Sequence, residues 1–273
     1  MLLESHPLPP EFAEPLTRLS DRIGSLVTRV VWYREIGSTN DTAIALADAG
    51  AEEGVVVVAD AQTAGRGRLG RAWASPAGAG IYATVILRPD ARVTPLVSLA
   101  AGLAIAEGIE AATGLRTRVK WPNDVFVDGG SGPASDRKLA GILAEGGALT
   151  SGTSWVVLGL GINVLPASYP PEVAARATSL EAELGRPVER GLVLAECLAA
   201  WSARYGELRR GRIDAVVSGW RARAASTFGR PIEWDADGVV RCGVAQDVDA
   251  SGALLVSTDG GTARVISGAI RWI

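Results

Sequence analysis

Hydrophobic residues recur with two different periods along the first two thirds of the chain, which predicts strands interleaved with helices. The segment "VVWYREI" predicts a strand that ends at a turn beside Gly37. The helix after it is capped by Ser38, Thr39 or Asn40 and ended by Gly50. The unbroken β-branched run "GVVVVADAQ" predicts a buried strand, and "AGIYATVILRP" predicts the next strand, which its proline ends.

A Thr-Pro pair at 94–95 predicts the N-cap and first residue of a longer amphipathic helix, which Gly114 ends. The segment "LRTRVKW" alternates, so Lys120 is expected to face away from Val119. "DVFVD" continues the sheet and a loop covers 129–133. Beyond it, "RKLAGILAEGG" and "SWVVLGLGINV" predict two neighbouring strands.

The remainder of the chain predicts helices and then a separate β module. Helical spacing marks 192–208 and 213–224, and a weaker helix over 14–28 follows a Pro-rich start. From Phe228 onward, short alternating segments are separated by Asp-Gly, Ser-Gly and Gly-Gly turns, which is typical of a small five-stranded SH3-like barrel. We therefore predict an N-terminal arm with a short helix, a main domain and a C-terminal β domain, over 1–29, 30–225 and 226–273.

The rarest residue types exclude several kinds of chemistry. Among 273 residues there is one histidine, His6, and there are two cysteines, Cys197 and Cys242. A nucleophile assisted by histidine, or a zinc site of His and Cys, therefore lacks its residues. The cysteines are expected to pack as small hydrophobic side chains rather than form a disulfide. Chemistry is left to Lys, Arg, carboxylates, amides and backbone groups, which favours phosphoryl or nucleotidyl transfer.

Composition narrows the environment and the partners. The chain is 48% hydrophobic with a net charge of −3, as in a globular protein, and this acidic balance disfavours a dedicated nucleic-acid binder. The first residues carry acids and prolines rather than a signal peptide, and the longest apolar stretch is interrupted by Glu107 and Glu110. A cytoplasmic protein without membrane association is the resulting expectation.

The segment "QTAGRGRLGRAW" contains the spacing G-x-G-x-x-G at Gly65, Gly67 and Gly70. A dinucleotide-binding loop must open directly into a helix, whereas Pro76 and further glycines follow here, so that interpretation fails. What remains is a glycine loop whose arginines can grip an anion, or simply an exposed basic turn.

Four other motifs are weak when each is taken alone. "KWPND" (120–124) is a strand exit whose Lys120 could oppose an anion, and "KLAGIL" (138–143) carries Lys138, which by itself is expected to be solvated. "GLGIN" (159–163) has two glycines in an apolar strand, from a bulge or from close approach of a ligand. "GSTN" (37–40) is explained by helix capping alone.

Together, and in this order, these five motifs resemble the biotin protein ligases, over about residues 31–164. The resemblance implies an α+β fold with a mixed central sheet and flanking helices, of the class II synthetase-like biotin/lipoate ligase type, followed by the SH3-like domain. It implies that biotin and ATP form biotinoyl-5′-AMP and pyrophosphate, and that biotin then passes to a lysine of a carrier domain.

The same resemblance implies the site residues. Arg68 and Lys120 would be catalytic, holding the biotin carboxylate and the α-phosphate, and Asp124 is a candidate to position or deprotonate the acceptor amine. Trp73 would pack over the closed loop and Asn163 would contact adenine. The biotin set is Ser38, Thr39, Asn40, Gln62, Gly65, Arg66, Gly67, Arg68 and Lys120. The ATP set is Arg66, Arg68, Arg71, Trp73, Lys120, Asn123, Lys138 and Asn163.

The resemblance also implies partners: biotin, Mg²⁺ with ATP on its phosphates, and the biotin carboxyl carrier domain of an acyl-CoA carboxylase. Only about thirty residues precede "VVWYREIGSTN", so we expect a monofunctional ligase that does not bind DNA, as a monomer or weak homodimer. The glycine–arginine loop is expected to order over the adenylate. Two alternatives remain, a lipoate–protein ligase and a biotin-responsive regulator without ligase activity.

Overall fold

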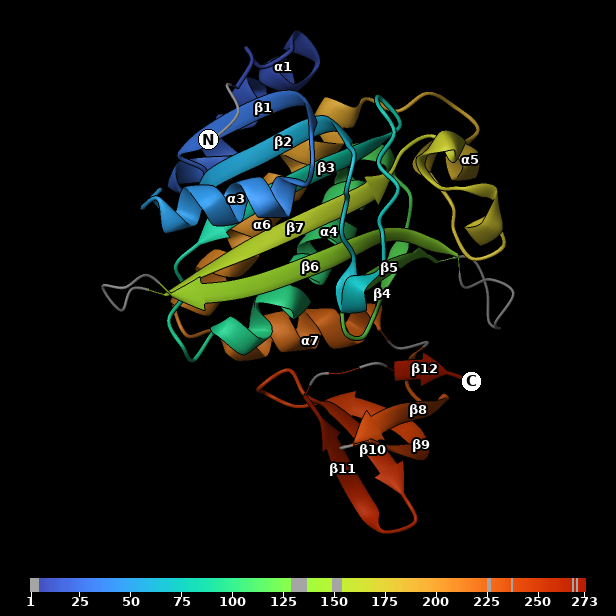
Figure 1. Cartoon of the computed structure of the whole chain (residues 1–273). Coiled ribbons are helices and arrows are strands. Elements are labelled where there is room, and N and C mark those ends of the chain that lie inside the picture. The colour runs from blue at the N-terminus through green and yellow to red at the C-terminus, as the bar shows by residue number, and fades with distance from the viewer. Residues whose placement is uncertain are drawn as a thin grey trace.

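The computed structural model describes residues 5–128, 137–148, 154–224, 227–236, 238–266, 268 and 270–273. The loop predicted over 129–133 lies outside these residues. Two sheets organise the described chain, a large one in the main domain and a small one in the C-terminal domain (Figure 1).

The large sheet has seven strands in the order β1-β2-β3-β7-β6-β5-β4, and it is mixed, as predicted. β1 and β2 run parallel, whereas every other neighbouring pair is antiparallel. The strands are β1 (Arg29–Ile36), β2 (Val55–Gln62), β3 (Gly80–Leu87), β4 (Thr117–Lys120), β5 (Asp124–Val127), β6 (Lys138–Ala148) and β7 (Ser154–Asn163). The antiparallel pairing of β6 with β7 confirms that these two predicted strands are neighbours.

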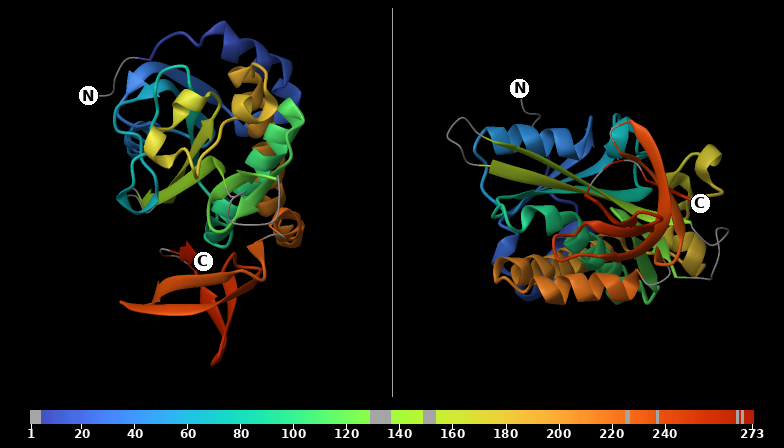
Figure 2. Two further views of the ribbon diagram at one scale, coloured as in Figure 1. Left: turned by 90° about the vertical axis from the view of Figure 1, so that its right-hand side faces the viewer. Right: turned by 90° about the horizontal axis from the view of Figure 1, so that it is seen from below.

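Helices cover the two faces of the large sheet unequally. α4 (Val97–Thr113), α6 (Arg190–Arg209) and α7 (Ile213–Arg223) bury one face in a large hydrophobic core (Figure 2). On the other face α3 (Thr39–Asp48) is the one described helix that packs on the sheet, over β2, β3 and β7, with a smaller core. A short helix α5 (Leu180–Leu184) follows β7. The part of this second face beyond α3 is therefore open, and it carries the candidate site.

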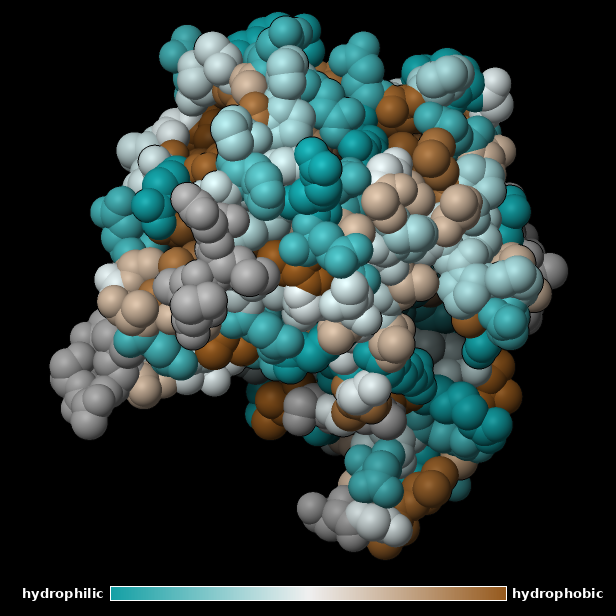
Figure 3. All heavy atoms as spheres, turned by 45° about the horizontal axis from the view of Figure 1, so that its top comes forward, coloured by the Kyte–Doolittle hydropathy of each residue, from teal (hydrophilic) through white to brown (hydrophobic). Residues whose placement is uncertain are grey.

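The stretch Thr94–Thr113, which joins a 3₁₀ turn to α4, is the one helical segment among the described residues that is long and apolar enough to cross a membrane. Its apolar window is 67% buried, because α4 packs against α6 and the sheet. On the face of the molecule drawn in Figure 3, hydrophobic residues are scattered among polar ones and do not form a band. The apolar composition of α4 is thus explained by its place in the core.

The N-terminal segment differs from the prediction in its helix boundaries. α1 (Pro10–Arg18) begins four residues before the predicted start, with Pro10 in the first turn, and α2 (Ser20–Ile23) follows after a break at Leu19. A proline in the first helical turn loses no hydrogen bond, so the Pro-rich start is compatible with a helix and was misjudged as an arm.

The predicted N-cap of the long core helix is also wrong in detail. Thr94 and Pro95 form a 3₁₀ turn before α4, and the Thr94 hydroxyl donates to the Asp90 carbonyl at 3.1 Å. Gly114 ends α4 in the left-handed conformation at φ 79°, as predicted.

The C-terminal domain is a five-stranded antiparallel sheet in the order β11-β10-β9-β8-β12, which confirms the predicted β module. The strands are β8 (Pro231–Ala236), β9 (Val239–Val248), β10 (Leu254–Thr258), β11 (Gly261–Val265) and β12 (Ile270–Trp272). Cys197 is buried in α6 as expected, but Cys242 on β9 is exposed, so the expectation of hydrophobic packing fails there; both cysteines are free.

The C-terminal domain lies against the β4 end of the large sheet, with β12 on the side facing the main domain (Figures 1 and 2). The Trp121 indole N–H donates to the Gly252 carbonyl at 3.0 Å. Arg221 of α7 donates to Asp247 at 2.7 Å in an ion pair. These contacts join the two domains through buried and half-buried groups.

Asp249 organises the turn that presents Gly252 to the main domain. Its carboxylate accepts hydrogen bonds from the Ser251 and Ala253 backbone N–H groups and from Arg264. Burial alone raises the pKa of Asp249, but these hydrogen bonds outweigh it and hold the pKa at about 2.

We expect Asp249→Asn to lower the free energy of unfolding by about 1–2 kcal/mol at pH 6, after allowance for solvent screening. A carboxyl with a depressed folded-state pKa stabilises the protein above its unfolded pKa, and this contribution is lost as pH falls through about 2. Denaturant unfolding of both proteins between pH 6 and pH 2 measures the difference, which should shrink toward zero. Asp235→Asn, at a carboxylate that accepts from the Gly238 N–H at 3.0 Å, is the matched control in the same domain.

Candidate functional site

A cavity of about 440 Å³, including its opening to solvent, lies on the uncovered face of the large sheet between α3 and the loop at 62–76. Its walls come from α3, β2, β6, β7 and the two loops that carry the glycine–arginine and "KWPND" motifs. Ten predicted site residues line it: Ser38, Thr39, Asn40, Gln62, Arg66, Gly67, Arg68, Trp73, Asn123 and Lys138. The motifs separated by up to 120 residues in sequence thus meet in one place.

Three glycines form the floor of the cavity. Gly141 on β6 is the register partner of Gly161 on β7, and Gly159 lies two residues along on the same face. A Cβ atom would lie 2.6 Å from the Trp73 ring at Gly161 and 2.1 Å from Asn40 Oδ1 at Gly159. The register of β7 is regular through "GLGIN", so a bulge does not explain these glycines, and the groups that approach them closely are side chains of the site itself.

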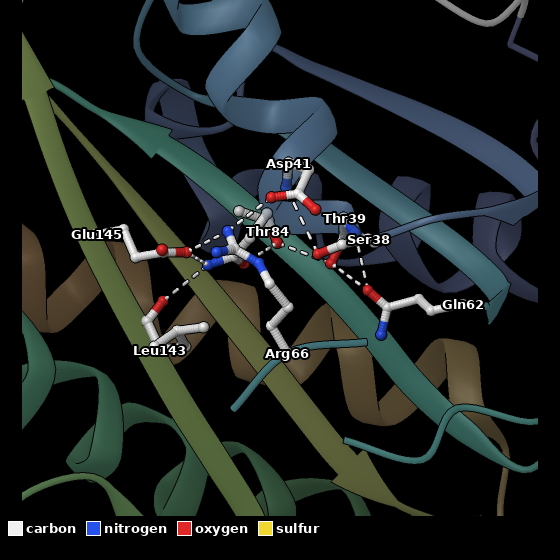
Figure 4. A network of polar contacts seen from close by, with 9 residues as sticks. Ser38, Thr39, Asp41, Gln62, Arg66, Thr84, Leu143 and Glu145 are labelled. Atoms are coloured by element: carbon white, nitrogen blue, oxygen red, sulfur yellow. Dashed lines mark hydrogen bonds and ion pairs between the residues drawn. The ribbon is translucent and has the colours of Figure 1, made fainter. Parts of the chain in front are cut away.

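The start of α3 supplies the polar end of the cavity (Figure 4). Ser38 caps the helix by accepting from the Asp41 N–H at 3.5 Å, so its predicted capping role is confirmed. The Gln62 side-chain carbonyl accepts from the Thr39 N–H at 2.8 Å and from the Thr39 hydroxyl at 3.1 Å. Its amide donates to the Ser75 hydroxyl at 2.7 Å, which fixes the orientation of Gln62.

Asn40 is held from both sides. The Thr84 hydroxyl on β3, fully buried, lies 2.7 Å from Asn40 Oδ1 and 2.9 Å from the Thr39 hydroxyl. The Asn40 amide donates to Glu145 on β6 at 2.8 Å. The first turn of α3 is therefore pinned to the sheet by polar contacts, at the place where a ligand would need fixed donors and acceptors.

Thr84→Val should loosen this end of the site without changing its shape. It leaves Asn40 Oδ1 and the Thr39 hydroxyl short of a partner, which costs about 1–3 kcal/mol of unfolding free energy. For biotin, the ligand that the sequence resemblance implies, we expect weaker binding in addition, because the Thr39–Gln62 pair loses its neighbour. Thr117→Val is the matched control: Thr117 is also buried and donates to the Ala106 carbonyl at 3.3 Å, on the other face of the sheet. Calorimetric titration with biotin should separate the two variants even where thermal unfolding does not.

Arg66 anchors the glycine–arginine loop to the rest of the site. Its guanidinium is 2.7 Å from both Asp41 of α3 and Glu145 of β6, and it is about one third exposed. The loop closes on itself through hydrogen bonds from the Gly67 N–H to Arg71 and from the Trp73 N–H to Gly65. Only a single 3₁₀ turn over Arg68–Gly70 is present, as expected for a loop that opens into no helix.

Gly65 and Arg71 lie outside the cavity lining given above. A Cβ at Gly65 would lie 2.4 Å from the Trp73 carbonyl, so this glycine allows the loop to double back beneath the site. Arg71 is exposed and lines a second, more open cavity on the loop together with Arg66 and Arg68.

Arg68 is the more buried cation of the loop. It donates to the Asn123 side-chain oxygen at 3.1 Å and to the Gly268 carbonyl of the C-terminal domain at 3.2 Å. Burial lowers the pKa of the Arg68 guanidinium, whereas the nearby Asp124 opposes that shift. The guanidinium stays charged at neutral pH because its ordinary pKa is so high.

Lys138, which lines the cavity, forms an ion pair at 2.6 Å with Asp124, which lies outside the lining. The Lys138 ammonium also lies 5.2 Å from the centroid of the Trp73 ring, so this lysine is not simply solvated, as its motif alone suggested. Trp73 packs over the glycine floor, which agrees with a role in covering the site.

Lys120 and Asn163 lie outside the lining of the cavity. Lys120 is 7% exposed and is the register partner of Asp124, at the edge of the site. Asn163 is 3% exposed and donates to the Thr178 carbonyl at 2.9 Å. Its predicted contact with adenine therefore needs a rearrangement of that hydrogen bond.

Thr84, Glu145 and Ser75 belong to the site but were not foreseen. Thr84 and Glu145 lie within ordinary strand patterns, where a single polar residue carries no signal. Their alternation places them on the same sheet face as the glycines, which is the only hint that the sequence contains.

Comparison with known proteins agrees with this geometry. Residues 32–163 match the Biotin/lipoate A/B protein ligase family, and residues 227–270 match the Biotin protein ligase C terminal domain. The chain is 38% identical to the biotin–[acetyl-CoA-carboxylase] ligase of Mycobacterium tuberculosis, covering 86% of this chain and 85% of that one. It is 33% identical to the bifunctional ligase/repressor BirA of Bacillus subtilis, over 96% and 80%. Its fold matches the biotin protein ligase from Aquifex aeolicus in complex with biotin and ATP, with 27% identity, a TM-score of 0.76 and coverage of 90% and 100%.

Proposed function

Since the chain belongs to the biotin protein ligase family, we propose that its cavity binds biotin and ATP, forms biotinoyl-5′-AMP and transfers biotin to a lysine of a biotin carboxyl carrier domain. The observation that carries the proposal is the convergence of Arg66, Arg68 and Lys138 on one cavity that also holds fixed amide and hydroxyl groups. The single histidine, His6, packs against Trp32 instead.

In the first step the biotin carboxylate attacks the α-phosphorus of ATP, a mixed anhydride forms and pyrophosphate leaves. The nucleophile belongs to the substrate, so the enzyme needs no base for this step. Its task is to bring two anions together and to stabilise the charge that develops on the α-phosphate. We assign that task to Arg68 and Lys120, with Arg66 and Arg71 toward the departing phosphates.

The ureido ring of biotin fits the polar end of the cavity. Ser38, Thr39 and Gln62 offer donors and acceptors there, and each is held by a neighbour before any ligand binds. Because these side chains are already held in place, they lose little conformational entropy when a small polar ring binds.

Mg²⁺ would enter with ATP. Each carboxylate near the cavity is already engaged: Asp124 with Lys138, and Asp41 and Glu145 with Arg66. Among the described residues no group of three His, Cys, Asp or Glu side chains could hold a metal. The residues therefore fit an ion held on the nucleotide's phosphates, where it would withdraw charge from the pyrophosphate leaving group.

In the second step the amine of the acceptor lysine attacks the biotinoyl carbonyl, and AMP leaves. The amine must lose a proton, and we assign to Asp124 the task of accepting it or of orienting the amine. Its ion pair with Lys138 must then open or share the proton. Asp124→Asn with single-turnover transfer from preformed adenylate tests this role, because the first step should change little.

The deciding experiment is mass spectrometry of a purified carrier domain after incubation with this protein, biotin and Mg·ATP. A mass increase of one biotinoyl group on a single lysine is the expected result. The rival substrate is lipoate, and the same incubation with lipoate tests it: lipoyl transfer in place of biotin transfer overturns the proposal.

A further inference from the structure

The last described residues of the C-terminal domain touch both cations that we assign to the α-phosphate. The Gly268 carbonyl accepts from Arg68 at 3.2 Å. The indole ring of Trp272 lies over Lys120, with 4.9 Å between the ammonium nitrogen and the ring centroid. A domain with no assigned part in the chemistry thus contacts the two residues on which adenylation depends most.

Two aromatic rings lie close to the Lys120 ammonium. Phe126, on the adjacent strand β5, faces the ammonium at 5.2 Å, and Trp272 faces it at 4.9 Å. The side chain is nearly buried, so little water reaches the charge. An ammonium placed over aromatic faces is attracted by the ring quadrupoles, and the attraction grows as water is excluded.

The position of Trp272 is fixed by its own domain. Trp272 is the register partner of Ile232 in the pairing of β12 with β8. The Arg230 guanidinium lies 5.8 Å from the centroid of the Trp272 ring. The contact of Trp121 with Gly252 docks the domain beside "KWPND". Trp272 therefore reaches Lys120 from a strand that is paired within the sheet of its own domain.

We propose that Trp272 is a positioning residue for adenylate formation: with Phe126 it holds the Lys120 ammonium, poorly hydrated, at the edge of the cavity beside Asp124. This rests on the proposed function, because it presumes that Lys120 acts on the biotin carboxylate and the α-phosphate. A poorly hydrated cation interacts more strongly with an arriving anion, and a held side chain loses less entropy when it binds. If so, the C-terminal domain contributes directly to the active site, through Trp272.

The test compares Trp272→Leu, which keeps apolar bulk but removes the ring, with Trp272→Phe, which keeps a ring. The rate of pyrophosphate release with biotin and Mg·ATP should fall about 3- to 30-fold in Trp272→Leu and recover largely in Trp272→Phe. Arg271→Ala, on the same strand but paired with Glu233, is the matched control and should react as the wild type does.

A double-mutant cycle separates positioning from general damage to the fold. In a Lys120→Ala background Trp272→Leu should have no further effect, since its influence passes through Lys120. A rate that falls equally in both backgrounds, or a Trp272→Leu rate equal to the wild type, overturns the inference.

A measurement that does not depend on activity keeps the inference distinct from the proposed function. The ε-CH₂ protons of Lys120 lie near two rings and should show upfield ring-current shifts in NMR spectra, reduced by Trp272→Leu and kept by Trp272→Phe. If wild-type protein releases no pyrophosphate, the proposed function fails. If these shifts are absent from the wild type, the placement of Trp272 fails whatever the activity.

Discussion

Lys120→Ala is expected to lower the rate of biotinoyl-AMP formation by about 10²–10³-fold, equivalent to about 2.7–4 kcal/mol of transition-state stabilisation. In the ground state the biotin carboxylate and the α-phosphate repel each other, and further negative charge gathers on the phosphate oxygens as the new bond forms. A buried ammonium beside them offsets that charge far better than water does. Its removal should therefore reduce the rate much more than it reduces the affinity for either substrate.

Lys120→Arg sharpens the test because it keeps the charge and changes the geometry. Phe126 and Trp272 contact the compact ammonium of Lys120, and a planar guanidinium is larger and has a different shape. We therefore expect only partial activity. Arg92→Ala serves as the control, since the Arg92 side chain is 86% exposed and pairs with Asp90 at the surface. Pyrophosphate release under saturating substrates measures all three proteins. A Lys120→Ala rate within about threefold of the wild type, in a folded protein, would contradict the assignment.

Gly159→Ala should nearly abolish biotin binding while the protein stays folded. The added methyl group would lie 2.1 Å from Asn40 Oδ1 and within 3.1 Å of the rest of that amide, so the Asn40 side chain must move. That movement breaks its contacts with Thr84 and Glu145 and disturbs the first turn of α3. We expect at least a 100-fold loss of affinity, by analogy with the loss of a buried polar pair, which costs several kcal/mol.

Gly146→Ala is the matched control for that loss. It lies on the adjacent strand β6, and there an added Cβ would meet its nearest neighbour, the Trp155 carbonyl, at an ordinary 3.5 Å. Both variants carry the same change of backbone entropy in a strand, so a difference between them reports the steric conflict alone. Calorimetric titration with biotin, alongside thermal unfolding, gives both quantities; equal affinities would show that the floor of the cavity tolerates a methyl group.

The sheet and the helices that position the site could be predicted from the sequence because their patterns are strong and local. The β-branched run predicts strand β2, and the spacing of the leucines predicts helices α4 and α6. The N-terminal helices were misjudged because prolines allow two outcomes, an extended arm or a first helical turn. Tertiary packing of Phe12 into the core decides between them, and that packing is invisible along the chain.

The sequence predicted which motif residues line the candidate site, but not which side chains hold them in place. Motif residues such as Thr39, Gln62 and Arg68 meet at the cavity as expected. By contrast, the partners that hold them, Thr84 and Glu145, come from strands with ordinary patterns. The contact between Trp272 and Lys120 depends on how two domains dock over more than 150 intervening residues, which no local periodicity encodes.

Arg66 already has anionic partners before a nucleotide arrives. Asp41 and Glu145 lie 2.7 Å from it, so a phosphate would exchange one counter-ion for another instead of neutralising a bare cation. Such an exchange displaces few salt ions from the loop. The ionic-strength dependence of ATP binding should therefore be shallower than three arginines in one loop suggest. Glu145 also accepts a hydrogen bond from the Asn40 amide at 2.8 Å, so a phosphate that drew Arg66 away would leave Glu145 bonded to Asn40.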